Sequence, residues 1–190
     1  MHEKPSVVNA TSDNFLMLKV KDGDLDHLGL LFERYHRSLF SYFYQLTQHP
    51  AECEDLVQNV FYRILKYRHQ FRGDGEFKAW VFHIAKNVGR DRFKKKRMQN
   101  LEAIENWQER IEDEAPNQIQ VLMEQDELDL LKRALQLLES DKREVLVMSK
   151  LQGMKYKDIG ELLGCEENAV KVRVFRALKA LREIYFKLKQ

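Results

Sequence analysis

Apolar residues recur every three or four positions along much of the chain, the spacing that places side chains on one face of an α-helix. The pattern predicts a helix over 28–46, another over 50–67 with Pro50 in its first turn, and a third that begins at Phe77. We expect their apolar stripes to be buried. The stripes are Leu31, Phe32, Tyr35, Leu39 and Phe43, then Cys53, Leu56, Val57, Val60, Phe61 and Ile64, then Phe77, Val81, Ile84, Ala85 and Val88.

Segment 71–77 separates the second and third of these helices and is predicted to be a loop. Its two glycines permit backbone conformations that other residues avoid. Gly73 and Gly75 superficially resemble a dinucleotide-binding fingerprint, but the third glycine and the preceding strand of that motif are missing. The loop therefore does not indicate nucleotide binding.

Helical periodicity returns in the last third of the chain. Asp141 and Glu144 have the spacing of a capping box ahead of the apolar Val145, Leu146, Met148 and Leu151, and Gly153 is expected to end that helix. A short helix over 156–164, with Ile159, Leu162 and Leu163 inward, is followed by a longer one from about Glu167 that buries Val170, Val174, Ala177 and Leu181. Two helices joined through Gly164 indicate a helix-turn-helix.

Composition fits a chain of helices. Eight Gly and three Pro among 190 residues are too few for many tight turns, and 44% hydrophobic residues can supply real cores. Between residues 101 and 127 nine acidic residues face a single base, which indicates a linker. We therefore predict an all-α protein with two helical domains, at 13–98 and 125–190, joined by an acidic linker at 99–124, the second domain being a helix-turn-helix.

The net charge of +2 conceals an uneven distribution, because a basic run over 92–97 precedes the acidic stretch. Cys53 and Cys165 stand far apart without CxxC spacing or nearby His pairs, which disfavours a zinc site or a disulfide framework. We find neither a signal peptide nor an apolar stretch long enough to span a bilayer. We expect a cytoplasmic protein without membrane insertion, cofactor or metal.

Polar side chains lie opposite the buried stripes of the second and third helices. On the second helix this face carries Asp55, Gln58, Asn59 and Tyr62, and on the third it carries His83, Asn87, Arg90 and Lys94. The basic residues Lys94, Lys95, Lys96 and Arg97 have an alternative interpretation as a solvated helix end, where cations suit the helix dipole. We expect Trp80 to lie in the core and His83 to be structural.

The last helix has a mixed outer face. Apolar Val172 and Phe175 lie there among Lys171, Arg173 and Arg176. DNA bases offer thymine methyl groups to apolar side chains, while Lys and Arg contact phosphates or guanine. DNA binding therefore explains both the apolar and the basic residues of this face. The alternative is that Val172 and Phe175 pack on another helix and the cations are merely solvated.

The chain contains several short motifs whose order and spacing are those of a known protein family. They are Lys21-Asp-Gly-Asp24, Ala51-Glu-Cys-Glu-Asp-Leu-Val-Gln58, Phe71-Arg-Gly with Trp80, Ile84-Ala-Lys-Asn87, Tyr156-Lys-Asp-Ile-Gly-Glu-Leu-Leu-Gly164 and Val170-Lys-Val-Arg-Val-Phe-Arg176. Over residues 13–188 the chain resembles bacterial alternative sigma factors of the extracytoplasmic-function group, which have only domains two and four. The resemblance implies a protein that is not an enzyme but binds core RNA polymerase, directs it to promoters and opens the duplex.

The resemblance also implies roles for particular residues. Asp55, Gln58, Asn59 and Tyr62 match the surface that docks on the clamp helices of the largest polymerase subunit. Phe71 and Asn87 match the pocket that holds an extruded base of the minus-10 element, with Arg90, Lys94, Lys95, Lys96 and Arg97 on the DNA backbone. Lys171, Val172, Arg173, Phe175 and Arg176 match the helix that reads the minus-35 element. An aromatic wall, an amide and cations are what binding of an unstacked base requires.

The family implies further partners. Its C-terminal domain contacts the flap of the second-largest polymerase subunit, and many members are held inactive by an anti-sigma protein. The chain departs from the common pattern at Glu139, at Asn168-Ala169 and at Val172, which leaves promoter specificity open. The acidic linker either mimics nucleic acid along the polymerase or stays extended by self-repulsion.

Two other classes of function compete with this interpretation. A dimeric helix-turn-helix regulator would use the C-terminal unit alone and bind palindromic duplex without polymerase. An enzyme is disfavoured because the sequence contains no P-loop, GxSxG or HExxH motif. Binding of promoter DNA with and without core polymerase separates the sigma factor from the regulator.

Overall fold

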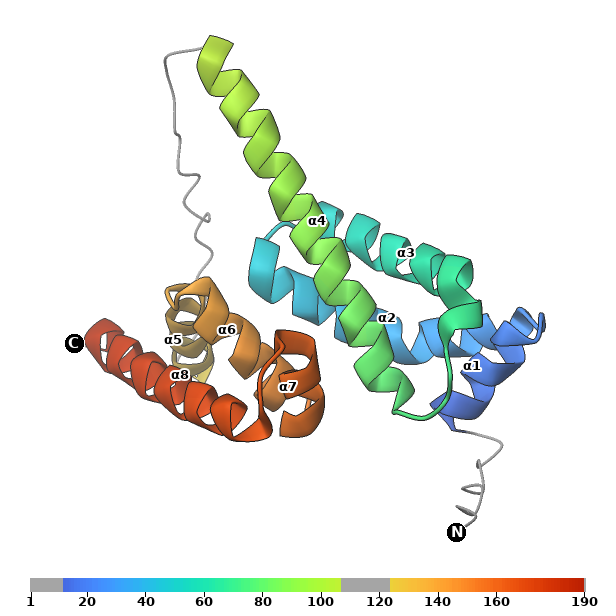
Figure 1. The fold of residues 1–190 in the computed structure, drawn as a ribbon. Helices are drawn as coiled ribbons and strands as arrows, with labels where there is room; N and C mark the ends of the chain where they lie inside the picture. Colours follow the sequence, from blue (N-terminus) through green and yellow to red (C-terminus); the bar gives the residue numbers. More distant parts are fainter. Residues whose placement is uncertain (1–11, 107–123, 190) are drawn as a thin grey trace.

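The computed structural model describes residues 12–106 and 124–189, and every regular element within these ranges is a helix. This confirms the all-α prediction. The first range contains α1 (Asp13–Lys21), α2 (Asp26–Thr47), α3 (Pro50–Tyr67), the 3-10 turn η1 (Arg68–Gln70) and α4 (Phe77–Asn106). The second contains α5 (Glu124–Gln136), α6 (Ser140–Leu146), the π-helical turn η2 (Val147–Leu151), α7 (Tyr156–Leu163) and α8 (Glu167–Leu188). In Figure 1 the last turns of α4 extend away from the other helices.

The predicted apolar stripes of α2, α3 and α4 form the N-terminal core with one exception. Every member is buried except Phe32, which is 41% exposed. The prediction for Phe32 was wrong because the α2 stripe is narrower at this turn. Leu31 takes the core position there, and Phe32 lies at the rim, where its ring packs on Phe61 at 4.8 Å. Trp80 is half-buried against the core, as predicted.

The helices α1 and α3 begin on signals in the sequence, whereas α4 is capped from a distance. Ser12 accepts a hydrogen bond from the Phe15 amide at 3.2 Å and so caps α1, and Pro50 opens α3. At the start of α4 the Phe77 amide donates instead to Oδ1 of Asn14, 63 residues earlier, at 2.7 Å. α4 then continues to Asn106, well beyond its buried stripe.

The helix that precedes the helix-turn-helix begins differently from the prediction. α6 begins at Ser140 after Glu139, so Asp141 lies within the first turn rather than at the N-cap. Glu144 points across to α2 and accepts a hydrogen bond from Tyr42 there, which removes it from the predicted capping box. The π-helical turn rotates Leu151 outward, where it is 53% exposed. Gln152 is the C-cap, and Gly153 follows it with φ +59°, so Gly153 ends this helical segment as predicted.

The turn between α7 and α8 depends on two glycines. Gly164 closes α7 with φ +64°, a conformation that L side chains rarely adopt. Gly160 faces the turn so closely that a Cβ atom there would lie 2.6 Å from the Cys165 carbonyl oxygen. The inward residues are as predicted: Ile159, Val170, Val174 and Ala177 are buried, and Leu162, Leu163 and Leu181 pack partly buried against the core.

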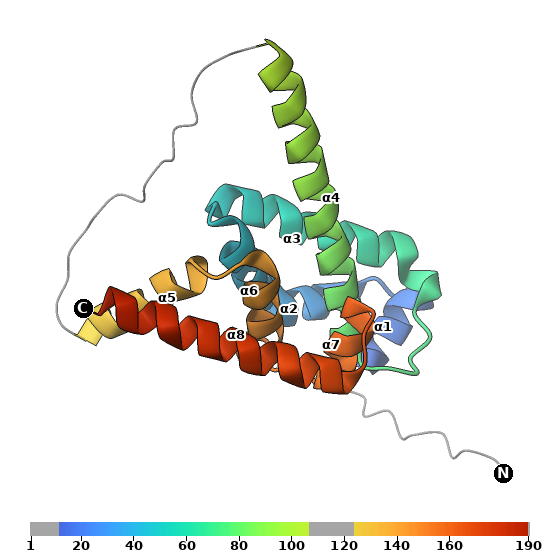
Figure 2. The ribbon, with the colours of Figure 1, turned by 60° about the vertical axis from the view of Figure 1, so that its left-hand side comes forward.

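The two halves of the chain pack on one another, as Figure 2 shows for α6 and α7 against α2 and α4. Tyr42 of α2 donates to Glu144 of α6 at 3.1 Å, and Arg143 donates to the Gln45 carbonyl oxygen at 3.3 Å. Lys86 of α4 donates to the carbonyl oxygen of Leu162, at the end of α7, at 3.1 Å. Polar side chains thus cross between the halves, and the buried apolar residues of both halves belong to one hydrophobic cluster.

Candidate functional site

The outer face of α3 is polar and accessible, as predicted. Asp55, Gln58 and Asn59 are exposed, and Tyr62 has 63% of its surface open to solvent. Beside Asp55 and Asn59 a crevice separates α3 from α4. Ion pairs tie its walls together: Arg92 to Glu52 at 2.8 Å and Arg63 to Asp91 at 2.9 Å. These pairs cross between the two helices and hold the α3 face at a fixed angle to α4.

α4 presents an amide within a cationic face. His83, Arg90 and Lys94 are exposed and Asn87 is half-buried. Nδ1 of His83 lies 3.3 Å from the Asn87 amide nitrogen, so His83 orients the amide, a contact that the sequence did not reveal. The side chains of Lys95, Lys96 and Arg97 lie outside the described residues.

Phe71 does not form an accessible wall. It is only 3% exposed, and its ring meets Phe77 and Trp80 edge-on, with centroids 6.0 and 5.2 Å away. In this conformation the aromatic cluster encloses the Phe71 ring, and the role of Phe71 in the base pocket stays a prediction. The exposed side chains of the loop are instead Arg72, Asp74 and Glu76.

α8 exposes the mixed face that its sequence predicts. Val172 is 46% exposed and Phe175 is 69% exposed, so neither packs on another helix of the described chain. Lys171 pairs with Glu167 one turn earlier at 2.9 Å. Arg173 and Arg176 are exposed and line a cleft. The other residues that line this cleft are Lys86 of α4, Leu163 of α7, and Glu139, Asp141, Lys142, Glu144 and Val145.

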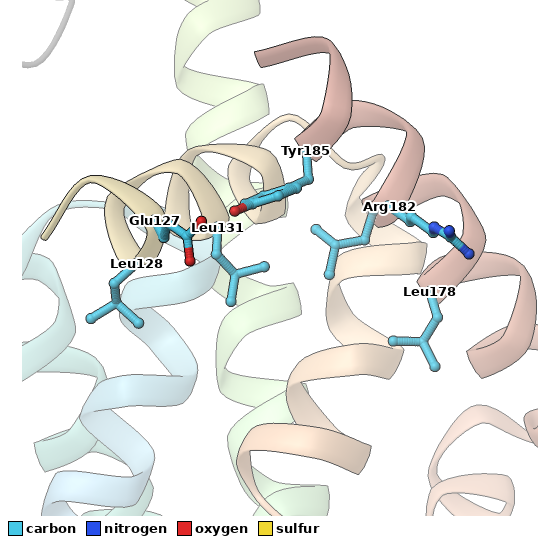
Figure 3. Close-up of a pocket in the computed structure, with 7 residues that line it drawn as sticks. Glu127, Leu128, Leu131, Leu178, Arg182 and Tyr185 are labelled. Atoms are coloured by element: carbon cyan, nitrogen blue, oxygen red, sulfur yellow. The ribbon is translucent and has the colours of Figure 1, made fainter. Parts of the chain in front are cut away.

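The structure contains a groove between α5 and α8 that was not predicted from the sequence. Its floor is apolar, from Leu128, Leu131, Leu178, Leu181 and Tyr185, and it encloses about 460 Å³. Glu127 and Arg182 stand at its edges, and Leu128 and Leu131 are 57% and 43% exposed (Figure 3). The sequence did contain a signal for this groove. Leu128 and Leu131 are three residues apart, as are Leu178 and Leu181, and these leucines lie partly outside the predicted core stripes.

Comparison with known proteins identifies the family of the chain. Residues 31–98 match the family model for sigma-70 region 2, and residues 128–181 match the model for sigma-70 region 4. The chain belongs to the sigma-70 family. Its relatives place this sigma factor in the extracytoplasmic-function group. RNA polymerase sigma factor CarQ of Myxococcus xanthus is 29% identical over 168 residues, 88% of this chain and 94% of CarQ.

A second relative and a solved structure agree. The extracytoplasmic-function sigma factor SigX of Bacillus subtilis is 27% identical over 157 residues, 81% of each chain. The sigma factor RpoE of Bartonella quintana, solved in complex with the anti-sigma factor NepR, is 25% identical with a TM-score of 0.64 and covers 85% of this chain and 98% of that one. In the described part of this sigma factor, no helix combines the length and apolar character that crossing a membrane requires.

Proposed function

We propose that this sigma factor binds core RNA polymerase in the cytoplasm, directs it to promoters with minus-10 and minus-35 elements and promotes DNA opening, without itself being an enzyme. The observation that carries the proposal is the exposed face of α8. Phe175 is 69% exposed and Val172 46% exposed among cations, an arrangement that water alone does not favour but a DNA major groove does. Lys171, Arg173 and Arg176 would contact bases or phosphates from the same face.

The minus-10 element would be read from α4. The Asn87 amide supplies a donor and an acceptor for one base, and Arg90 and Lys94 supply charge for the backbone. Lys95, Lys96 and Arg97 continue this basic run along the sequence. The two reading units would correspond to residues 13–98 and 125–190, with the acidic linker of 99–124 between them.

Polymerase would dock on two surfaces. The α3 face of Asp55, Gln58, Asn59 and Tyr62 offers polar contacts to the clamp helices of the largest subunit. The α5–α8 groove offers an apolar floor to an amphipathic segment such as the flap of the second-largest subunit. Because the relative RpoE of Bartonella quintana was solved with an anti-sigma factor, we extend the proposal to control of this chain by such a protein.

Promoter geometry requires the two halves to separate. By their names the two elements lie about 25 base pairs apart, or about 85 Å along the duplex. Lys86 of α4 and Arg176 of α8 line a single cleft, so the two helices that carry the proposed reading faces lie close together in this arrangement. Binding of both elements therefore needs an open form, and core polymerase is the partner that would hold it open.

A comparison of DNA binding with and without core polymerase tests the proposal. We expect weak promoter binding by the free chain and firm, sequence-selective binding by the holoenzyme, followed by run-off transcripts from a promoter library. Asp55→Arg reverses a charge on the α3 face and should reduce holoenzyme formation, whereas Asn87→Ala should leave it intact and reduce opening of the minus-10 region. Firm binding of palindromic duplex by the free chain would instead indicate a conventional dimeric regulator.

A further inference from the structure

The loop that leads into α4 is held along one face of α1. Asn14, Leu18 and Lys21 are spaced by four and three residues and therefore share a helix face. Nδ2 of Asn14 donates to the Gly75 carbonyl oxygen at 2.7 Å and, more weakly, to that of Gly73 at 3.5 Å. The Lys21 ammonium donates to the Phe71 carbonyl oxygen at 2.7 Å. Both ends of the loop are thus fixed by side chains about 50 to 60 residues earlier in the chain.

The middle of the loop is also shaped by α1. Gly73 has φ +78°, and a Cβ atom there would lie 3.6 Å from the methyl groups of Leu18. The same Asn14 amide caps α4, because its Oδ1 accepts from the Phe77 amide at 2.7 Å. One side chain therefore sets both the path of the loop and the start of the helix that carries Asn87.

We propose that Asn14 is a positioning residue for minus-10 recognition, acting with Lys21 to hold the loop over 71–76 in the conformation in which it meets the single-stranded promoter. The inference rests on the proposed function of α4, and it extends that function to the loop that leads into the helix. Ordering a free loop costs about 1–2 kcal/mol per residue, so a loop ordered in advance by α1 spares this cost when DNA binds. Discrimination between bases benefits most, because a loose loop adapts to several bases equally well.

Asn14→Asp separates this positioning role from a role in folding. The carboxylate keeps the acceptor for the Phe77 amide and places negative charge at the N-terminus of α4, which the helix dipole favours. It loses both donors to the loop and repels the Gly73 and Gly75 carbonyl oxygens. Lys21→Met removes the donor at the other end. Lys19→Met is the matched control, because Lys19 is exposed on the same helix and lies over the Phe15 ring.

The experiment uses holoenzyme assembled from the full chain. Its affinity is measured for fork-junction DNA whose single-stranded minus-10 segment is substituted one base at a time. We expect Asn14→Asp and Lys21→Met to lower the preference for the best base by about five- to tenfold, the effect of one lost hydrogen bond. The affinities of both variants for core polymerase and of their holoenzymes for minus-35 duplex should stay within about twofold of the wild type, and their thermal unfolding midpoints should stay close to it. The Lys19→Met holoenzyme should discriminate between bases as the wild type does.

Two results would contradict the inference in distinguishable ways. If the wild type discriminates and Asn14→Asp discriminates equally well, the proposed function stands and the positioning role of Asn14 is wrong. If the wild-type holoenzyme shows no base preference anywhere in the single-stranded segment, the proposed reading of the minus-10 element fails, and the inference fails with it. An even loss of affinity for every base and for the duplex would indicate a folding defect alone and would also overturn it.

Discussion

The hydrogen bond between Tyr42 and Glu144 gives a direct test of the closed arrangement of the two halves. Tyr42 is 1% exposed, and its ring meets Phe43 and Phe82 edge-on at 5.3 and 5.5 Å. Its hydroxyl donates to Oε1 of Glu144, across the contact between α2 and α6, at 3.1 Å. Tyr42→Phe keeps the ring contacts and deletes only the donor. The substitution therefore acts on the contact between the halves rather than on the core.

The size of the effect follows from the acceptor. A hydrogen bond to a charged group contributes about 1.5–3 kcal/mol when its loss leaves the charge unpaired. Glu144 is half-buried and lines the cleft with Arg173 and Arg176, so water reaches its carboxylate and the lower end applies. A loss of about 1.5 kcal/mol shifts the equilibrium between the closed and open arrangements roughly tenfold toward the open one. The free chain should then bind minus-35 duplex more tightly than the wild type does.

Energy transfer between dyes on the two halves measures the shift. Lys66 of α3 and Lys179 of α8 are exposed and provide attachment sites. Tyr44→Phe is the control, because it removes a hydroxyl from the same helix, where the Tyr44 ring stacks on Phe40. A Tyr42→Phe chain whose distance distribution and minus-35 affinity both equal those of the wild type would refute the reasoning. It would mean that Tyr42 does not hold the halves together.

Three further outcomes are expected. Gly160→Ala should lower the unfolding free energy by about 1–3 kcal/mol, because its Cβ would meet the Cys165 carbonyl oxygen at 2.6 Å. The control Gly29→Ala, whose Cβ would have no atom within 4 Å, should raise the unfolding free energy by about 0.5–1 kcal/mol. Thermal unfolding measures both variants, and equal effects would contradict the close approach at Gly160. If Lys171 contacts a phosphate, Lys171→Ala in the holoenzyme should lower the dependence of minus-35 affinity on salt concentration by about one unit of log–log slope. If Lys171 reads a base, the substitution should instead weaken the binding free energy by about 1–3 kcal/mol at one base pair. An unchanged slope and affinity would exclude both roles. Burial and its hydrogen bond to Asp13 raise the pKa of Tyr35 above its ordinary value of 10.0, so the stability that this group contributes is complete below pH 10.0 and falls as the pH rises further. Tyr35→Phe should therefore show a shallower alkaline loss of unfolding free energy than the wild type, and equal slopes would contradict this.

Much of the fold could be predicted because helical periodicity is local. The stripes of α3 and α4 follow from helical spacing, and α3 begins at Pro50 and ends at Tyr67, close to the predicted boundaries. The errors occurred where distant residues intervened. Glu144 was assigned to a capping box because its spacing suits one, but Tyr42, 102 residues away, takes its carboxylate instead. Phe32 was assigned to the core because it lies three residues before Tyr35, but Leu31 takes the core position at that turn.

The candidate site was predicted unevenly for the same reason. The exposed face of α8 follows from its own periodicity, so Val172 and Phe175 lie where the sequence indicates. The burial of Phe71 depends on Phe77 and Trp80 arriving against its ring, which no local rule contains. The α5–α8 groove was missed because two helices about 50 residues apart must meet before their leucines form one surface.

The amino-acid sequence by itself determined that this chain is helical, which faces of α3, α4 and α8 are polar or basic, and, through its motifs, the family to which it belongs. The tertiary structure alone decided which of those faces meet. Local spacing sets the direction in which a side chain leaves its helix, but whether it meets solvent, a ring or a carboxylate depends on helices brought together by burial of apolar area across the whole chain. The hold of Asn14 on a loop some 60 residues away is therefore visible only in the folded molecule.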